Sequence, residues 1–127
     1  MNNYVKQVGG DHYSAEYQHW DWVPETGLGY LEASATAYIA RYMKKDGLKD
    51  LEKAMSFINK IIVSKYLKPA GTRRGIDSRL RHRYLTAANL IDTPEGDLTT
   101  AIDTWKDDDD LEKIVKLLEE LISDYRS

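Results

Sequence analysis

The 127-residue sequence contains no cysteine, only one phenylalanine and three prolines, and its apolar runs are short. The absence of cysteine excludes disulfide bonds, thiolate metal ligands and cysteine nucleophiles. No apolar run approaches the roughly 20 residues that a membrane-spanning helix needs. Residues 1–6 lack the apolar segment of a signal peptide, so we expect an intracellular protein. Apolar residues make up 42% of the chain and charged residues 31%, which predicts a folded domain with a packed core.

Charge is distributed unevenly along the chain, although the net charge is only −3. Residues 65–83 carry seven Lys or Arg against one acid, whereas residues 84–127 carry four against twelve. A basic segment before an acidic one predicts an anionic ligand or a contact between basic and acidic surfaces of two subunits. We therefore expect a homo-oligomer. Nucleic acid is not expected as a partner, because it would be repelled by an acidic chain.

Hydrophobic spacing predicts an all-α fold, since apolar residues recur at intervals of three and four and no long stretch alternates with period two. A helical hairpin is expected at residues 30–45 and 48–67, joined at Asp46-Gly47. An irregular N-terminal arm precedes this hairpin core, with a short helix at residues 20–26 that Pro24 limits to about one turn. A loop at 69–77 and a turn at 93–96 separate the additional C-terminal helices, which are predicted at residues 78–90, 98–105 and 109–125.

Four basic residues cluster at the expected end of the hairpin, and we name Arg41, Lys44, Lys45 and Lys53 the hairpin corner. An arginine fork flanked by ammonium groups suits a phosphate group. One alternative is that these cations only complement the negative end of a helix and line a solvated rim. Another is that Arg41 forms an ion pair with Asp50 or Glu52 on the next helix.

If the phosphate belongs to a nucleotide, two features of the N-terminal region could bind its sugar and its base. Asp11-His12-Tyr13 follows two glycines, and these side chains can bind a sugar or phosphate or move a proton, although a structural turn is the alternative. Trp20 and Trp22 belong to an aromatic-rich stretch at residues 13–30. Aromatic rings stack on bases at about 1–3 kcal/mol each. The alternative for them is an apolar plug over the hairpin.

Two further charged clusters have competing interpretations. An arginine-rich segment predicts either an anion site or RNA-binding edge, or ion pairs with the acidic C-terminal region; its members are Arg73, Arg74, Arg79, Arg81 and Arg83. The four aspartates at 107–110 could hold Mg²⁺, but acids at the start of a helix, with one as N-cap, explain them better. No metal site is predicted, because the three histidines lack metal-ligand spacing.

The order of the N-terminal motifs resembles a small domain of unknown function from tailed bacteriophages. The matching elements are Asp11-His12-Tyr13, Tyr38-Ile39-Ala40-Arg41, Lys44-Lys45-Asp46-Gly47, and Asp50-Leu51 with Lys53-Ala54. The resemblance as a whole covers roughly residues 9 to 66, about half of the chain. The characterised relative of this family is a coliphage nucleotide kinase that phosphorylates deoxynucleoside monophosphates without a Walker loop. The sequence departs from the family pattern at Glu32-Ala33, where the family has Gly-Asn, and at Ala37, where it has Lys.

The resemblance implies a nucleotide-kinase-like phage protein in the cytoplasm of the bacterial host. It divides the chain into a motif region, 1–68, and a basic loop with acidic helices, 69–127, which either belongs to the same domain or mediates oligomerisation. Asp11 and His12 would be the catalytic residues. The ligand-binding residues would be Tyr13, Trp20, Trp22, Arg41, Lys44, Lys45 and Lys53. Mg²⁺ would be required only by a kinase.

Two other functions remain open at this stage. A non-catalytic oligomeric sponge could sequester nucleotide signals made by host anti-phage defence, since the lost Asn and Lys could remove catalysis and leave binding. An inhibitor could instead bind a host protein through the charged C-terminal half. The sequence does not decide whether the protein is an enzyme.

Overall fold

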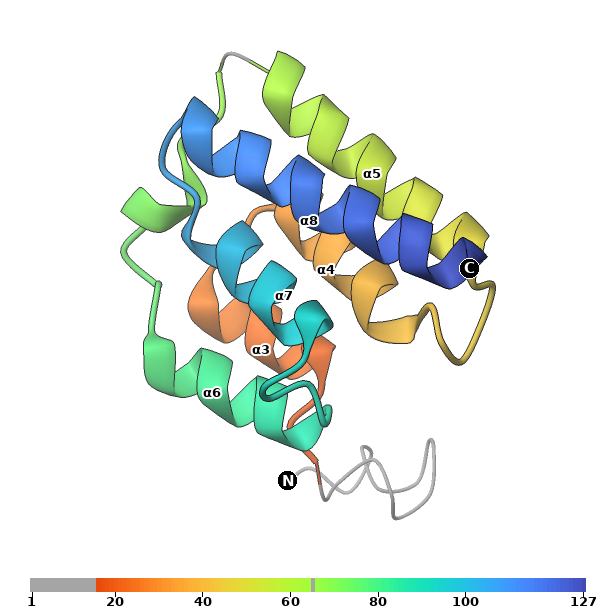
Figure 1. The fold of residues 1–127 in the computed structure, drawn as a ribbon. Coiled ribbons are helices and arrows are strands. Elements are labelled where there is room, and N and C mark those ends of the chain that lie inside the picture. The colour runs from red at the N-terminus through yellow and green to blue at the C-terminus, as the bar shows by residue number, and fades with distance from the viewer. Residues whose placement is uncertain (1–15, 65) are drawn as a thin grey trace.

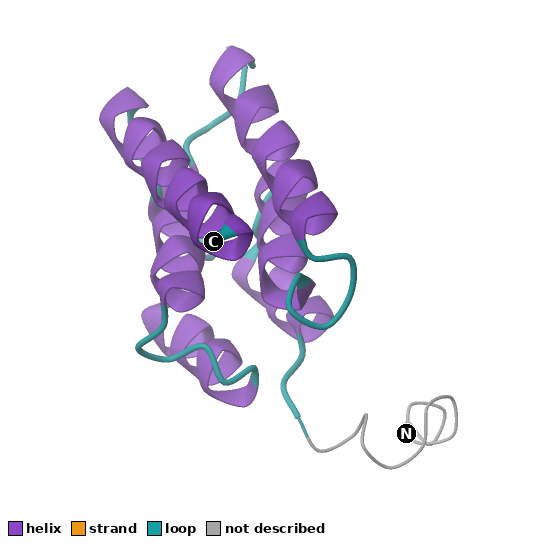
Figure 2. Cartoon of the chain, turned by 45° about the vertical axis from the view of Figure 1, so that its right-hand side comes forward, coloured by secondary structure: helices purple, strands orange, loops and turns teal. Residues whose placement is uncertain are grey.

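The computed structural model describes residues 16–64 and 66–127, which form six α-helices and one 3-10 helix (Figure 1). The elements are α3 (His19–Thr26), α4 (Tyr30–Arg41), α5 (Leu48–Val63), η1 (Ala70–Thr72), α6 (Ser78–Ala87), α7 (Pro94–Thr104) and α8 (Asp108–Arg126). The described chain contains no strand, which confirms the predicted all-α class (Figure 2). The predicted site residues Asp11, His12 and Tyr13 lie outside the described residues.

The predicted hairpin is present, and α8 completes a layer with it. Helices α4 and α5 pack side by side, and α8 lies along α5 (Figure 1). Leu51 and Ile58 on α5 and Ile114 and Leu118 on α8 are fully buried where the helices meet. Arg126 Nη2 lies 3.8 Å from the Glu52 carboxylate, which joins the end of α8 to the start of α5. The helices therefore run antiparallel, and α8 ends beside the hairpin corner.

Helix α3 has eight residues with Pro24 inside it, instead of the single turn predicted. Both hairpin helices end earlier than predicted. Helix α4 ends at Arg41 instead of residue 45, so Lys44 and Lys45 lie in the turn. Helix α5 ends at Val63 instead of residue 67 because Ser64 has an extended backbone, and its hydroxyl bonds to the Lys60 carbonyl at 2.6 Å. The buried face of α5 consequently excludes Tyr66, which is 95% exposed.

The predicted turn at residues 93–96 is wrong, because residues 94–97 form the first turn of α7. The Thr93 hydroxyl accepts a hydrogen bond from the Gly96 N–H at 3.0 Å, as an N-cap residue does. Pro94 occupies the first helical position, where a missing N–H costs no hydrogen bond. The same residues that favour a turn therefore begin a helix here.

A buried carboxylate joins three distant segments, and we name Asp103, Arg73, Arg81 and Thr26 the Asp103 cluster. The Asp103 side chain is fully buried, and Arg81 Nη1 donates to its Oδ2 at 2.8 Å. Arg73 donates to the other carboxylate oxygen and, at 2.8 Å, to the Thr26 carbonyl. Two of the five arginines thus pair with the acidic C-terminal region within one chain, which was one of the predicted alternatives.

Rings from α3 and α6 form the opposite side of the core. Trp22 stacks on Tyr84 with 4.7 Å between ring centroids, and His19 contacts both rings edge-on. His19 Nε2 lies 2.8 Å from the Thr36 hydroxyl on α4, so this imidazole links α3 to the hairpin. Burial lowers the pKa of His19 from its ordinary 6.5 to about 4.

This pKa predicts that acid destabilises the fold through His19. The unfolded chain binds a proton at His19 near pH 6.5, whereas the folded chain does so only near pH 4, so stability is lost as the pH falls between these values. We expect the His19 contribution to decline by roughly 1 kcal/mol per pH unit in that window. Urea unfolding of the wild type and His19→Gln between pH 7 and pH 4 measures it. The variant should show a shallower slope than the wild type.

Candidate functional site

The structure places the four cations of the hairpin corner around the turn between α4 and α5, and two of them contact the same ring. Arg41 ends α4, Lys44 and Lys45 lie exposed in the turn that follows, and Lys53 lies exposed on α5. The Arg41 guanidinium lies 4.8 Å from the centre of the Tyr38 ring, and Lys53 Nζ lies 5.5 Å from the same centre. One ring is thus flanked by cations from both helices of the hairpin.

Arg41 also has a structural contact that was one of the alternatives. Its Nε and Nη2 donate to the two oxygens of Asp50 at 3.3 and 3.2 Å, and the Asp46 N–H donates to the same carboxylate at 3.1 Å. Burial raises the pKa of Asp50, but the hydrogen bonds from Arg41 and Asp46 outweigh burial and hold it below its usual value. The Arg41 side chain remains 44% exposed, and a guanidinium carries five N–H donors. Arg41 can therefore fix the hairpin and still face an anion.

Three aromatic rings continue from the corner along the hairpin, and we name Tyr30, Tyr38 and Phe57 the aromatic row. The Phe57 ring on α5 lies 5.9 Å from Tyr38 and 6.0 Å from Tyr30, both of which are on α4. Tyr30 is 75% exposed, and the other two are half-buried. Spacing along the sequence does not reveal this row, because only the packing of α4 on α5 brings Phe57 beside Tyr38.

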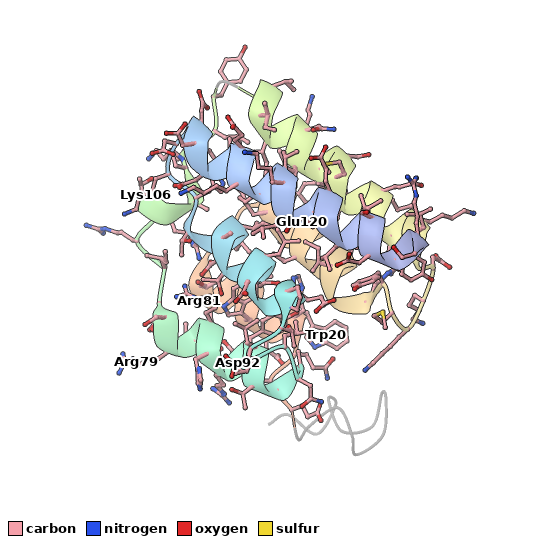
Figure 3. The ribbon with its side chains drawn as sticks, in the orientation of Figure 1. Trp20, Arg79, Arg81, Asp92, Lys106 and Glu120 are labelled. Carbon is pink, nitrogen blue, oxygen red and sulfur yellow. The ribbon has the colours of Figure 1, made fainter. Side chains whose placement is uncertain are left out.

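The two tryptophans predicted to bind ligand lie in different environments. Trp22 is fully buried with one ring face stacked on Tyr84, so in this structure it is a core residue and its ring is not available to a base. Burial therefore argues against the ligand role predicted for Trp22. Trp20 lies in the first turn of α3 and is 64% exposed (Figure 3). Its ligand role stays a prediction.

The turn of the corner depends on Gly47, which has φ +54° and ψ −121°. This conformation is strained for a residue with a side chain, and a Cβ here would overlap the Tyr125 hydroxyl at the end of α8. Tyr125 packs edge-on against Tyr42, which in turn donates to Glu95 of α7 at 2.5 Å. Residues of α7 and α8 therefore pack against the turn that carries the hairpin corner.

We expect Gly47→Ala to lower the free energy of unfolding by about 1–3 kcal/mol, because alanine is strained at this backbone position. Urea denaturation measures the change. The double variant Gly47→Ala/Tyr125→Ala separates the two causes, since it removes the overlap and keeps the backbone strain. A Gly47→Ala protein as stable as the wild type would show that the turn does not require glycine.

The described residues contain no group of three or more Asp, Glu, His or Cys side chains placed to hold a metal ion. Asp107 is the N-cap of α8, since its carboxylate accepts from the Asp110 N–H at 2.9 Å.

Within the described chain, every helix is too short or too polar to span a bilayer. Comparisons with protein families, with curated proteins and with solved structures return no match for this chain.

Proposed function

We propose that this protein binds nucleotides at the hairpin corner, as a nucleotide-kinase-like phage protein. The observation that carries the proposal is the junction of exposed cations with the aromatic row around Tyr38. Phosphate binding requires charge and N–H donors, and base binding requires a ring face. The corner and the row offer both on one surface of the hairpin, in the part of the chain that carries the family resemblance.

In this proposal the phosphates contact Lys44, Lys45 and the exposed edge of Arg41, and the base lies against the aromatic row. Phosphoryl transfer depends mainly on positioning and on neutralising charge, so a kinase without a P-loop is physically reasonable. As a kinase, the protein would move a phosphoryl group from a nucleoside triphosphate to a monophosphate and produce two diphosphates. Mg²⁺ would then accompany the triphosphate. The catalytic assignment of Asp11 and His12 stays a prediction.

A non-catalytic sponge is the second candidate, and a specific contact favours it. Asp50 is a buried carboxylate beside the corner, and the Arg41 fork and the Asp46 N–H occupy it. A carboxylate held in this way is a poor general base, whereas the exposed cations need no base to bind phosphate. Homo-oligomerisation, which would add binding sites to a sponge, and the host cytoplasm as its location remain predictions.

Incubation with a nucleotide panel, with and without Mg²⁺, distinguishes these functions. The panel contains deoxynucleoside monophosphates with ATP and, separately, cyclic and linear nucleotide signals. New diphosphates in the chromatogram indicate a kinase. Depletion of a free nucleotide that is recovered intact after denaturation indicates a sponge. Absence of both contradicts the proposed nucleotide binding and leaves the inhibitor of a host protein.

We expect the double substitution Lys44→Gln/Lys45→Gln to weaken nucleotide binding about ten- to a hundredfold, because charge-assisted contacts to phosphate are lost. These side chains are exposed, so the melting temperature should not change. Calorimetric titration with the nucleotide that binds the wild type measures the effect, and Lys113→Gln on α8 is a matched control for the loss of positive charge. Arg41→Ala is less informative, since it also leaves the buried Asp50 without its fork. Unchanged affinity in the double variant would place the ligand elsewhere.

A further inference from the structure

A second group of basic residues surrounds a hollow between α6 and α7. We name it the α6–α7 hollow; its volume is about 510 Å³ and it is lined by Ser78, Arg79, Arg81, His82, Leu85 and Thr100. Three of these side chains are basic, two carry hydroxyl groups and none carries a carboxylate. The volume falls in the usual range of small-molecule sites. The lining thus has the composition of an anion site with an apolar patch at Leu85.

The arginines of α6 differ in how they are held, as Figure 3 shows for Arg79 and Arg81. Arg79 points outward: its side chain is 91% exposed, and its Nε lies 3.7 Å from the carboxylate of Asp77, the N-cap of α6. Arg81 turns inward and is fixed by the fully buried Asp103, to which its Nη1 donates at 2.8 Å. One carboxylate oxygen uses only part of the five donors of a guanidinium. Asp103 therefore orients Arg81 at the hollow before any ligand arrives, which lowers the entropic cost of binding.

A second hollow on the other side of α6 is a weaker candidate for an anion. It shares Arg79 and His82 with the first and adds Arg83, which lies over the Tyr17 ring at 4.2 Å. It is also lined by Glu16, whose negative charge would repel an anion. The α6–α7 hollow has no such acid in its lining and contains an arginine fixed by a buried partner, so the observations favour it.

We propose that the α6–α7 hollow is a second anion site that binds the phosphate group of a small phosphorylated molecule. Arg81 forms the fixed contact, Arg79 and His82 approach from the rim, and the hydroxyls of Ser78 and Thr100 accept or donate hydrogen bonds at the sides. This site is separate from the hairpin corner. Helix α6 and the turn between α4 and α5 lie on different sides of the molecule in both ribbon views (Figures 1 and 2).

The test uses inorganic pyrophosphate as the probe, titrated by calorimetry in a low-salt buffer. It starts from the full chain carrying Lys44→Gln/Lys45→Gln, so that weakened binding at the hairpin corner does not mask the second site. Arg79→Gln should reduce the affinity of this protein for pyrophosphate by about three- to tenfold, since one charge-assisted contact is lost. Thr100→Phe should weaken binding, because the added ring occupies part of the hollow and the change removes no basic side chain. Arg74→Gln is the control, since Arg74 is exposed but does not line the hollow.

The outcomes separate the two proposals. Loss of pyrophosphate affinity with Arg79→Gln and Thr100→Phe, but not with Arg74→Gln, supports the second site. No binding by the starting protein, or equal affinity in all variants, overturns it. Arg79 also lines the second hollow, so if Thr100→Phe does not fold, Arg83→Gln decides the matter. Arg83 lines only the second hollow, and its substitution should leave the affinity for pyrophosphate unchanged if the α6–α7 hollow is the site. Nucleotide binding that is unchanged by the Lys44 and Lys45 substitutions would contradict the hairpin corner alone.

Discussion

Replacing Trp22 with alanine should lower the free energy of unfolding by about 3–5 kcal/mol, because the change leaves a large cavity in the core. Trp22 is fully buried, stacks on Tyr84 and contacts His19 edge-on, so its removal also deprives two other rings of their packing partner. Urea denaturation followed by circular dichroism measures the loss. Any effect on nucleotide binding should follow the fraction of folded protein.

Trp22→Phe provides the matched control for this prediction. The indole Nε1 is buried without a hydrogen-bond partner in the described structure. Phenylalanine keeps an aromatic ring against Tyr84 and removes this unpaired N–H, whose burial is itself unfavourable. We expect Trp22→Phe to cost about 1–2 kcal/mol, clearly less than alanine. A stable Trp22→Ala protein with lost ligand affinity would restore the ligand role that burial argues against.

Replacing Asp103 with alanine should also lower the free energy of unfolding by about 3–5 kcal/mol, because it leaves two guanidinium groups without their buried counter-charge. The side chains of Arg73 and Arg81 are only 13% and 16% exposed, so water cannot replace the lost carboxylate fully. The segments around Thr26, Arg73 and Arg81 all meet at this position. The substitution should therefore weaken the packing of α3, α6 and α7 on one another.

Two variants calibrate the Asp103 measurement. Asp97→Ala removes an exposed acid from the same helix and should change stability by no more than about 0.5 kcal/mol. Asp103→Asn keeps one acceptor oxygen, replaces the other with an NH2 donor that faces an arginine, and removes the charge, so it should cost clearly more than Asp97→Ala. If Asp103→Ala costs less than about 1 kcal/mol, the Asp103 cluster contributes little and its arginines find other partners.

The hairpin was predictable because its determinants are close in the sequence. Asp46-Gly47 marks the turn, and Arg41 and Asp50 are nine residues apart, so their pairing could be considered from spacing alone. The start of α7 was not predictable in the same way. Thr93 and Pro94 favour a turn and a helix N-terminus equally well, and only the observed hydrogen bond to Gly96 distinguishes them.

The Asp103 cluster and the aromatic row could not be predicted from local spacing. Five arginines lie between residues 73 and 83, and nothing in their spacing shows that Arg73 and Arg81 turn inward while Arg79 stays in solvent. Likewise, Trp20 and Trp22 are the same residue type two positions apart, yet Trp20 is exposed and Trp22 is fully buried. In each case the deciding contact comes from a helix elsewhere in the chain, which one sequence does not reveal.

The sequence separation within the Asp103 cluster has a kinetic consequence. Arg73 reaches back 47 residues to Thr26 and forward 30 residues to Asp103, whereas the Arg41–Asp50 pair at the turn of the hairpin spans nine. Bringing distant segments together costs more loop-closure entropy, so the hairpin should form early on the folding pathway and the cluster late. Contacts that form after the transition state act mainly on the rate of unfolding. In stopped-flow experiments Asp103→Ala should therefore unfold faster than the wild type and fold at nearly the wild-type rate. The Asp103 cluster would then set the lifetime of the folded state and not the speed at which it forms.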